Sequence, residues 1–284
     1  MAKGKSKAKK ISAKIALREN VAPGADYADK CRTLVKLGYD GIEITNQYSL
    51  DDCAMINRVT KETGIQPVLT SCGAACLVDP RKDEREKGVQ LLIKHLEVCA
   101  EIGALGVIHP PLISMTMQMD GPRQRIPDLS PLYSTNKLER GLLVALYQRI
   151  CKRAKQLGIY LIIEPLNRYE QWWPCTLADG AAICKEVGSK HCTIMADFFH
   201  MHIEEEDIGN AIAENIKLIT NVHIADSTRK TPGTGLTDFK PGFRALKKGG
   251  YPHYLGLECE VPGDDKLKEL KRAAKYTRDL YNKC

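Results

Sequence analysis

The sequence lacks the features that would indicate a membrane protein or a disulfide-bonded one. No apolar run approaches the roughly 20 residues that a helix needs to cross a bilayer. The lysine-rich residues 1–10 are followed by no apolar segment, as a secretory signal would require. The 11 cysteines are odd in number and include no CxxC pair. We therefore expect reduced thiols in a cytoplasmic protein without membrane contact.

An excess of charge over the folded part of the chain is also missing. The formal net charge is +7, but five of these charges belong to Lys residues at positions 3, 5, 7, 9 and 10, and a sixth to Lys14 at the start of the domain. Residues 1–12 are predicted to form a flexible Lys-rich tail, and residues 13–284 a single domain. Such a tail can touch nucleic acid, but a solvated extension explains it equally simply. Nucleic acid is therefore not an expected partner.

Short apolar runs alternate with amphipathic helical stretches along the whole domain. The predicted strands are residues 13–18, 40–45, 66–71, 105–110, 159–164, 192–197, 221–226 and 254–259. Eight strands alternating with eight helices predict an α/β fold, a single (β/α)₈ TIM barrel. An open doubly wound sheet is the alternative, but no Gly-rich phosphate loop follows the first strand. Residues 111–136 form a long irregular stretch, which we expect to act as a lid at the barrel mouth.

Four strands of the second half end in a side chain that can bind a metal ion. These residues are Glu164, Asp197, His223 and Glu258. In a barrel, the carboxyl ends of the strands meet at one rim, so the four side chains should converge there. Three carboxylates with one imidazole suit a divalent ion such as Mn²⁺, with Co²⁺ and Mg²⁺ as alternatives, better than a structural zinc ion. Each residue alone could cap a turn or face solvent, but four such coincidences are improbable.

Further polar residues follow these ligand candidates closely. Glu170, His200 and Arg229 are predicted to hold a polyol substrate by charged hydrogen bonds, although each alone could be a surface residue. His109 ends the fourth strand and is a candidate acid, base or supporting group. Aromatic residues make up only 6% of the chain, and Trp173, one of two tryptophans, either walls the substrate pocket or packs under a loop.

Four segments resemble the motifs of one enzyme group. They are EPLNRYEQW (164–172), ADFFHMHIEE (196–205), HIADSTRKTPGTG (223–235) and LGLECEV (255–261). Their residues, and their order along the chain, resemble those of the D-tagatose 3-epimerase and D-psicose 3-epimerase group, within the xylose isomerase-like TIM barrel superfamily. The resemblance implies that the four ligand candidates bind Mn²⁺ and that Glu164 and Glu258 act as the acid/base pair. It also implies that Glu170, His200 and Arg229 bind the sugar.

The implied chemistry has more than one outcome. A carboxylate removes a proton next to a carbonyl, and a metal-stabilised enediolate forms. Return of the proton from the opposite face gives an epimerase, and return to the neighbouring carbon gives an isomerase. Expulsion of a leaving group gives a lyase on 3-oxo-glycosides, which in related enzymes needs a small accessory subunit. An apurinic-site endonuclease of the same superfamily is disfavoured, because its additional histidines are absent from residues 227–240.

Two loops depart from the pattern of the ketohexose epimerases. Those enzymes place aromatic residues after the first and fourth strands, whereas residues 18–26 and 109–121 contain none. This argues against a free ketohexose. The Met-rich fourth loop suits a larger or more apolar sugar derivative, or else an apolar contact in a homo-oligomer, expected as a dimer or tetramer.

Overall fold

The computed structural model describes residues 13–113 and 125–284. The predicted tail, residues 1–12, and the middle of the predicted lid lie outside this part of the chain. Within it, no helix is long and apolar enough to cross a membrane.

Eight parallel strands close into a barrel in the order of the sequence, so that β1 pairs with both β2 and β8. The predicted TIM barrel is confirmed. The strands are β1 (Lys14–Arg18), β2 (Gly41–Ile44), β3 (Gln66–Ser71), β4 (Gly106–His109), β5 (Tyr160–Ile163), β6 (Cys192–Asp197), β7 (Ile219–Ile224) and β8 (Tyr254–Leu257). Every predicted strand is present, although β7 begins two residues earlier than expected.

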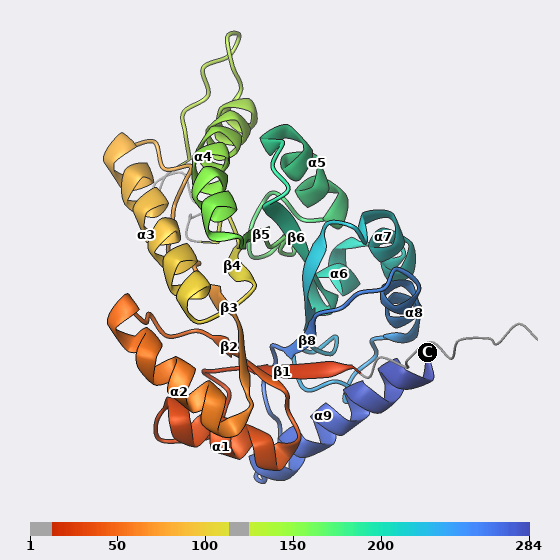
Figure 1. Cartoon of the computed structure of the whole chain (residues 1–284). Helices are drawn as coiled ribbons and strands as arrows, with labels where there is room; N and C mark the ends of the chain where they lie inside the picture. The colour runs from red at the N-terminus through yellow and green to blue at the C-terminus, as the bar shows by residue number, and fades with distance from the viewer. Residues whose placement is uncertain (1–12, 114–124) are drawn as a thin grey trace, which may run out of the picture.

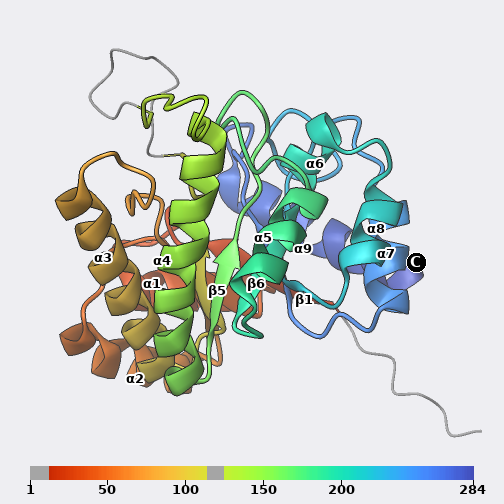
Figure 2. The same cartoon turned by 90° about the horizontal axis from the view of Figure 1, so that it is seen from above.

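Helices surround the barrel on its outside (Figure 1, Figure 2). They are α1 (Tyr27–Leu37), α2 (Cys53–Thr63), α3 (Lys82–Glu101), α4 (Thr135–Leu157), α5 (Leu177–Val187), α6 (Phe198–Glu204), α7 (Ile208–Asn215), α8 (Lys240–Lys248) and α9 (Lys266–Lys283), with a short 3₁₀ turn, η1 (Leu50–Asp52). The eight predicted helices are present. The additional helix is α6, which starts directly after β6 without an intervening loop.

The core has an outer and an inner part. The outer part lies between the strands and the helices and includes Ile15, Leu34 and Phe243, which are almost fully buried. The inner part is a smaller cluster of strand residues: Ala16, Val68, Leu69, Ile108, Ile162 and Met195. Because side chains alternate across a strand, these residues fill the inside of the barrel. The barrel is therefore plugged below its mouth by these side chains.

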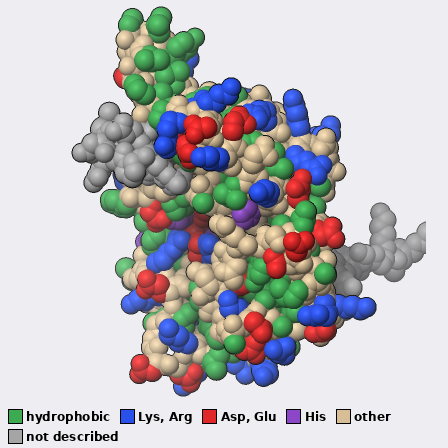
Figure 3. Space-filling model, turned by 90° about the vertical axis from the view of Figure 1, so that its left-hand side faces the viewer, with side chains coloured by type: hydrophobic (Ala, Val, Ile, Leu, Met, Phe, Trp, Pro, Cys, Tyr) green, Lys and Arg blue, Asp and Glu red, His purple; other side chains and the backbone are tan. Residues whose placement is uncertain are grey.

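The rim at the carboxyl ends of the strands is hollowed. Figure 3 views the molecule from the side of α2 and α3 and shows acidic, basic and histidine side chains in a hollow there. The described end of the predicted lid, residues 125–134, projects from the body beside α4 (Figure 1). It is closed by a bridge between Leu129 and Tyr133, and Leu132 at its tip is 77% exposed.

All eleven cysteines are free thiols, and nine of them are buried. They are distributed over helices α1 to α5 and several strands and loops, rather than gathered at one place. Burial raises the pKa of Cys99 to about 12, so that this thiol stays protonated.

Candidate metal and active site

The four ligand candidates meet at the mouth of the barrel. Asp197 ends β6 and pairs in register with His223 of β7, while Glu164 and Glu258 follow β5 and β8 directly. One ligand atom from each lies within 4.8 Å of the other three. Glu164, Asp197 and His223 are buried, and Glu258 is partly exposed.

The imidazole lies at the centre of this group. His223 Nδ1 is 2.9 Å from Glu258 Oε2, 3.7 Å from Asp197 Oδ2 and 3.8 Å from Glu164 Oε1. Three carboxylates held this closely repel one another, and burial strengthens the repulsion. A divalent cation bound between the four side chains would relieve it. Oxygen ligands with one imidazole match the preference of Mn²⁺, Co²⁺ or Mg²⁺, so the residues present fit the ion expected from the sequence.

Two arginines also face these carboxylates. Arg229 places Nη1 3.3 Å from Asp197 Oδ2 and Nη2 2.9 Å from Glu258 Oε2. Arg18, the last residue of β1, forms an ion pair with the other oxygen of Glu258. Arg18 was not among the site residues predicted from the sequence.

The loop that carries Arg229 is organised by one buried carboxylate. Asp226 accepts hydrogen bonds from the backbone N–H groups of Ser227, Gly233, Thr234 and Thr237. Arg229 itself has a φ of 59°, in the left-handed region that a non-glycine residue rarely adopts. The strained backbone at this point aims the guanidinium back at the carboxylates.

The pKa values of two carboxyl groups are driven in opposite directions. Burial raises the pKa of Glu164 above its ordinary value. Burial acts in the same sense on Asp197, but its electrostatic interactions with His200 and the Arg229 guanidinium outweigh burial and hold the pKa of that carboxyl well below its usual range. Neighbouring carboxyls with separated pKa values are typical of sites that move protons.

The far side of His223 contacts a carboxylate that the sequence analysis missed. Glu43 of β2 is fully buried, and its Oε2 lies 2.8 Å from His223 Nε2. Burial alone would lower the pKa of His223, but the negative charge of Glu43 outweighs burial, and the pKa is raised to about 9. A carboxylate behind a ligating histidine keeps the proton on the far nitrogen and leaves the near one free for a metal ion. A lone acid inside the apolar run DGIEIT was the available signal, since a buried carboxylate needs a partner.

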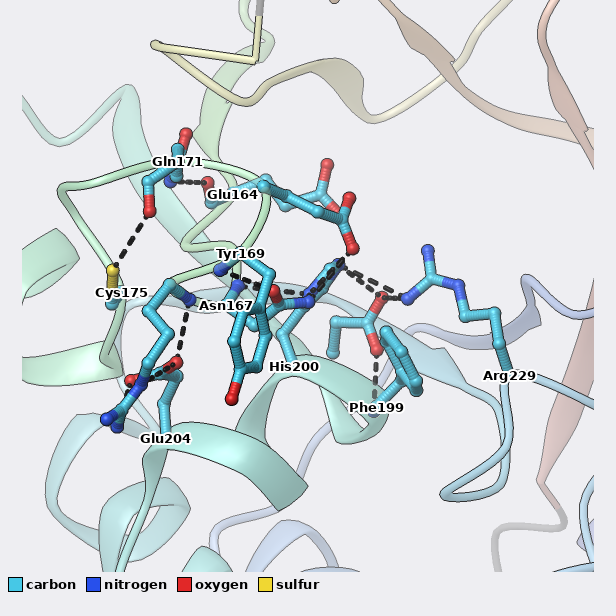
Figure 4. A network of polar contacts seen from close by, with 12 residues as sticks. Glu164, Asn167, Tyr169, Gln171, Cys175, Phe199, His200, Glu204 and Arg229 are labelled. Atoms are coloured by element: carbon cyan, nitrogen blue, oxygen red, sulfur yellow. Dashed lines mark hydrogen bonds and ion pairs between the residues drawn. The ribbon is translucent and has the colours of Figure 1, made fainter. Parts of the chain in front are cut away.

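The predicted substrate-binding residues Glu170 and His200 lie next to the ligand candidates. His200 is buried, with Nε2 3.6 Å from Asp197 Oδ2 and 3.2 Å from Arg229 Nη1. Its Nδ1 accepts a hydrogen bond from the backbone N–H of Asn167 (Figure 4). The side-chain amide of Asn167 donates to Glu170. His200 therefore links Glu170, through Asn167, to Arg229 and Asp197 in one network of polar contacts.

His109 and Trp173 are not brought to the ligand candidates. His109 is fully buried, with Nδ1 2.6 Å from the Tyr147 hydroxyl and Nε2 2.8 Å from the Ala75 carbonyl oxygen. Trp173 stacks on the guanidinium of Arg140, at 5.2 Å, in a cavity of about 310 Å³ beside α4.

A larger cavity adjoins Glu258 on the side of β1 and β8. It measures about 600 Å³ and is lined by Arg18, Asn20, Val21, Arg229, Glu258, Cys259, Glu260, Val261 and Lys266. The mouth thus offers a space for a small molecule in contact with one of the ligand candidates.

Comparison with known proteins agrees with this architecture. The profile of the xylose isomerase-like TIM barrel family matches residues 31–280, and the chain belongs to this family.

Among the most similar characterised proteins are two epimerases. The chain is 30% identical over 262 residues to the 3-dehydro-D-guloside 4-epimerase of Escherichia coli K12, covering 88% of this chain and 93% of the relative. It is 31% identical over 219 residues to the D-psicose 3-epimerase of Agrobacterium fabrum C58, covering 74% and 71%. The crystal structure of 3-keto-D-glucoside 4-epimerase from E. coli superimposes with a TM-score of 0.83 at 26% identity, covering 94% of this chain and 99% of the other.

Proposed function

We propose that the protein is a divalent-metal-dependent carbohydrate epimerase that exchanges a proton next to a carbonyl group. The observation that carries this proposal is the convergence of Glu164, Asp197, His223 and Glu258 within 4.8 Å at the barrel mouth. The relatives named above are sugar epimerases with the same barrel, which supports the same class of reaction here. Mn²⁺ is the proposed ion, and Co²⁺ or Mg²⁺ offer the same oxygen preference.

Glu164 and Glu258 are the proposed acid/base pair. They reach the site from β5 and β8, so a sugar between them meets one carboxyl on each face. When bound, the metal ion supplies the positive charge that stabilises the enediolate of the substrate. Removal by one residue and return by the other inverts the carbon.

The other site residues predicted from the sequence are proposed to have different roles. Arg229, His200 and Glu170 are proposed to hold substrate oxygens, because they contact one another beside the ligand candidate Asp197. Trp173 would contact only a substrate that extends toward α4. His109 would act through the protein rather than on the substrate, because both of its ring nitrogens are already engaged.

The E. coli relative favours an oxidised glycoside as the substrate class, since its name specifies a 3-dehydro-guloside. The same class serves the second candidate function, a lyase that expels the group next to the enediolate. Both reactions begin with the same proton abstraction, and the fate of the leaving group separates them.

Solvent exchange tests the proposal. The Mn²⁺-loaded protein is incubated in D₂O with ketoses, aldoses and 3-oxo-glycosides, and NMR follows deuterium incorporation and products. We expect exchange at one sugar carbon that disappears with EDTA, together with an epimer. An unsaturated product would instead identify the lyase. Absence of exchange with every sugar, in protein that retains its metal ion, would contradict the proposal.

A further inference from the structure

We propose that the cavity beside Glu258 is a subsite for an oxyanion, a carboxylate or phosphate carried by the sugar substrate. Arg18 and Lys266 are its specificity-determining residues. This inference rests on the proposed function, because it places the remainder of the sugar at the four ligand candidates. It also states that the substrate carries a negative charge, which the class of reaction does not specify.

The position of the cavity connects it to the reaction centre. Glu258 belongs to both, with one oxygen 2.9 Å from His223 Nδ1 and its side chain in the cavity lining. The remaining lining residues come from the segment after β1, the loop after β7, the segment after β8 and the start of α9. A sugar bound at the ligand candidates would extend into this space. Its volume of about 600 Å³ lies within the usual range of small-molecule pockets.

The charges around the cavity favour an anion. Arg18, Arg229 and Lys266 supply three positive charges, whereas Glu258 and Glu260 supply two negative ones. Glu258 is a metal-ligand candidate, and a bound cation would neutralise it there. Within residues 13–113 and 125–284, Lys266 has no ion-pair partner within 4.0 Å. Lys266 is exposed at the edge of the cavity, where a carboxylate or phosphate on the sugar would pair with it.

Arg18 has hydrogen-bonding capacity to spare. Its two terminal nitrogens contact Glu258 and, at a long 3.4 Å, the Ser71 hydroxyl. Its Nε is buried and has no acceptor in the described part of the chain. An unsatisfied buried donor is costly, and the planar guanidinium is well suited to a two-oxygen partner. Arg18 also ends β1, at the start of the segment 18–26 that contains no aromatic side chain. At this position the protein therefore has the positive charge of Arg18 instead of the aromatic side chain that the ketohexose epimerases place against the sugar.

The proposal is tested by comparing how tightly an anionic sugar and its neutral counterpart bind to the Mn²⁺-loaded protein. D-fructose 6-phosphate is compared with D-fructose, and D-glucuronate with D-glucose, by NMR titration. We expect the anionic member of at least one pair to bind about tenfold more tightly or better, as one charged hydrogen-bonded contact would provide. The advantage should shrink several-fold in Lys266→Ala and Arg18→Gln. Lys268→Ala, which removes an exposed lysine of the same helix outside the cavity, should retain it.

The two pairs separate the sources of the oxyanion. An advantage confined to the fructose pair identifies a phosphate, and one confined to the glucose pair identifies a carboxylate. Equal binding of charged and neutral sugars overturns the proposal. So does an advantage that survives in both variants, since the oxyanion would then be held by the metal ion. Deuterium exchange with a neutral sugar, together with equal binding of the charged and neutral members of both pairs, would retain the proposed reaction while overturning the subsite.

Discussion

At the scale of single residues, Glu258 is distinguished from the other ligand candidates by its exposure. Its side chain is 18% exposed, whereas those of Asp197 and His223 are at 1% or below. It also contacts both Arg18 and Arg229. These features make Glu258 the member of the group best placed to touch both a metal ion and a substrate carbon.

We predict that Glu258→Gln lowers turnover by about 10²–10⁴-fold, the range for loss of a general acid or base. The fold should survive, because the amide has the same shape as the carboxyl and sits at the rim. Deuterium exchange and circular dichroism measure the two effects. Glu62→Gln, on the outer helix α2, is the control and should behave as wild type. Wild-type exchange in Glu258→Gln would remove this residue from the catalytic pair.

His109 makes stability depend on pH. Burial lowers its pKa to about 4 in the folded protein, against about 6.5 in an unfolded chain. Because the unfolded state takes up the proton first, folding loses stability as the pH falls below 6.5, until both states are protonated near pH 4.

We predict that the metal-free protein loses about 2 kcal/mol of unfolding free energy between pH 7 and pH 5 through this residue. Urea denaturation of wild type and His109→Gln at both pH values measures the contribution as a difference. Other titrating groups are common to both proteins and cancel. An identical loss in the variant would show that His109 is not the neutral, doubly bonded residue described here.

The ligand candidates could be predicted from the sequence because strand ends of a barrel share one rim. Glu43 and Arg18 could not be assigned in the same way. The sequence does not show which side chain on another strand a charged strand residue contacts. These contacts depend on the closure of the barrel, which brings Glu43 of β2 against His223 of β7 and places β1 beside β8.

At the scale of elements, strand β8 contains a position without a side chain, Gly256, just before the ligand candidate Glu258. A β-carbon added at Gly256 would overlap with the carboxylate of Glu43. The glycine therefore leaves the space in which Glu43 supports His223 from behind.

We predict that Gly256→Ala weakens metal binding by about 10–100-fold, as loss of a supporting carboxylate commonly does. Equilibrium titration with Mn²⁺ measures the effect. Gly141→Ala, on helix α4 where a β-carbon would meet nothing within 4 Å, should bind the ion as wild type does. Normal affinity in Gly256→Ala would mean that Glu43 does not orient the imidazole.

Helix α6 shows why one element escaped prediction. Asp197 is both the last residue of β6 and the N-cap of α6, with its side chain accepting from the Phe199 N–H. Without a loop between them, the sequence carries no turn residue to mark the change from strand to helix. The remaining helices were predictable because their ends carry ordinary signals, such as Gly38 after α1 and the Thr176–Asp179 capping box of α5.

At the scale of the whole molecule, the ligand candidates lie at the ends of four consecutive strands in the second half of the chain. A bound ion would connect β5, β6, β7 and β8 at their carboxyl ends. Ligand binding to the folded state alone stabilises it by mass action.

We predict that Mn²⁺ at about 100 times its dissociation constant adds about 2.7 kcal/mol and raises the melting temperature by roughly 5–10 °C. Calorimetry with Mn²⁺ and with EDTA measures the shift. Asp197→Ala should show little or none of it. A melting temperature unaffected by Mn²⁺ would contradict the ligand set, whatever the catalytic activity.

The buried cysteines give this barrel a set of natural labelling positions. Cys31, Cys53, Cys99, Cys151 and Cys184 each mark one of the successive helices α1 to α5. In the native protein, an alkylating reagent should reach only the half-buried Cys175 and Cys284. Any other thiol becomes reactive only when its own segment opens. Alkylation followed by peptide mass spectrometry would therefore show the order in which successive parts of the ring come apart, without an introduced probe.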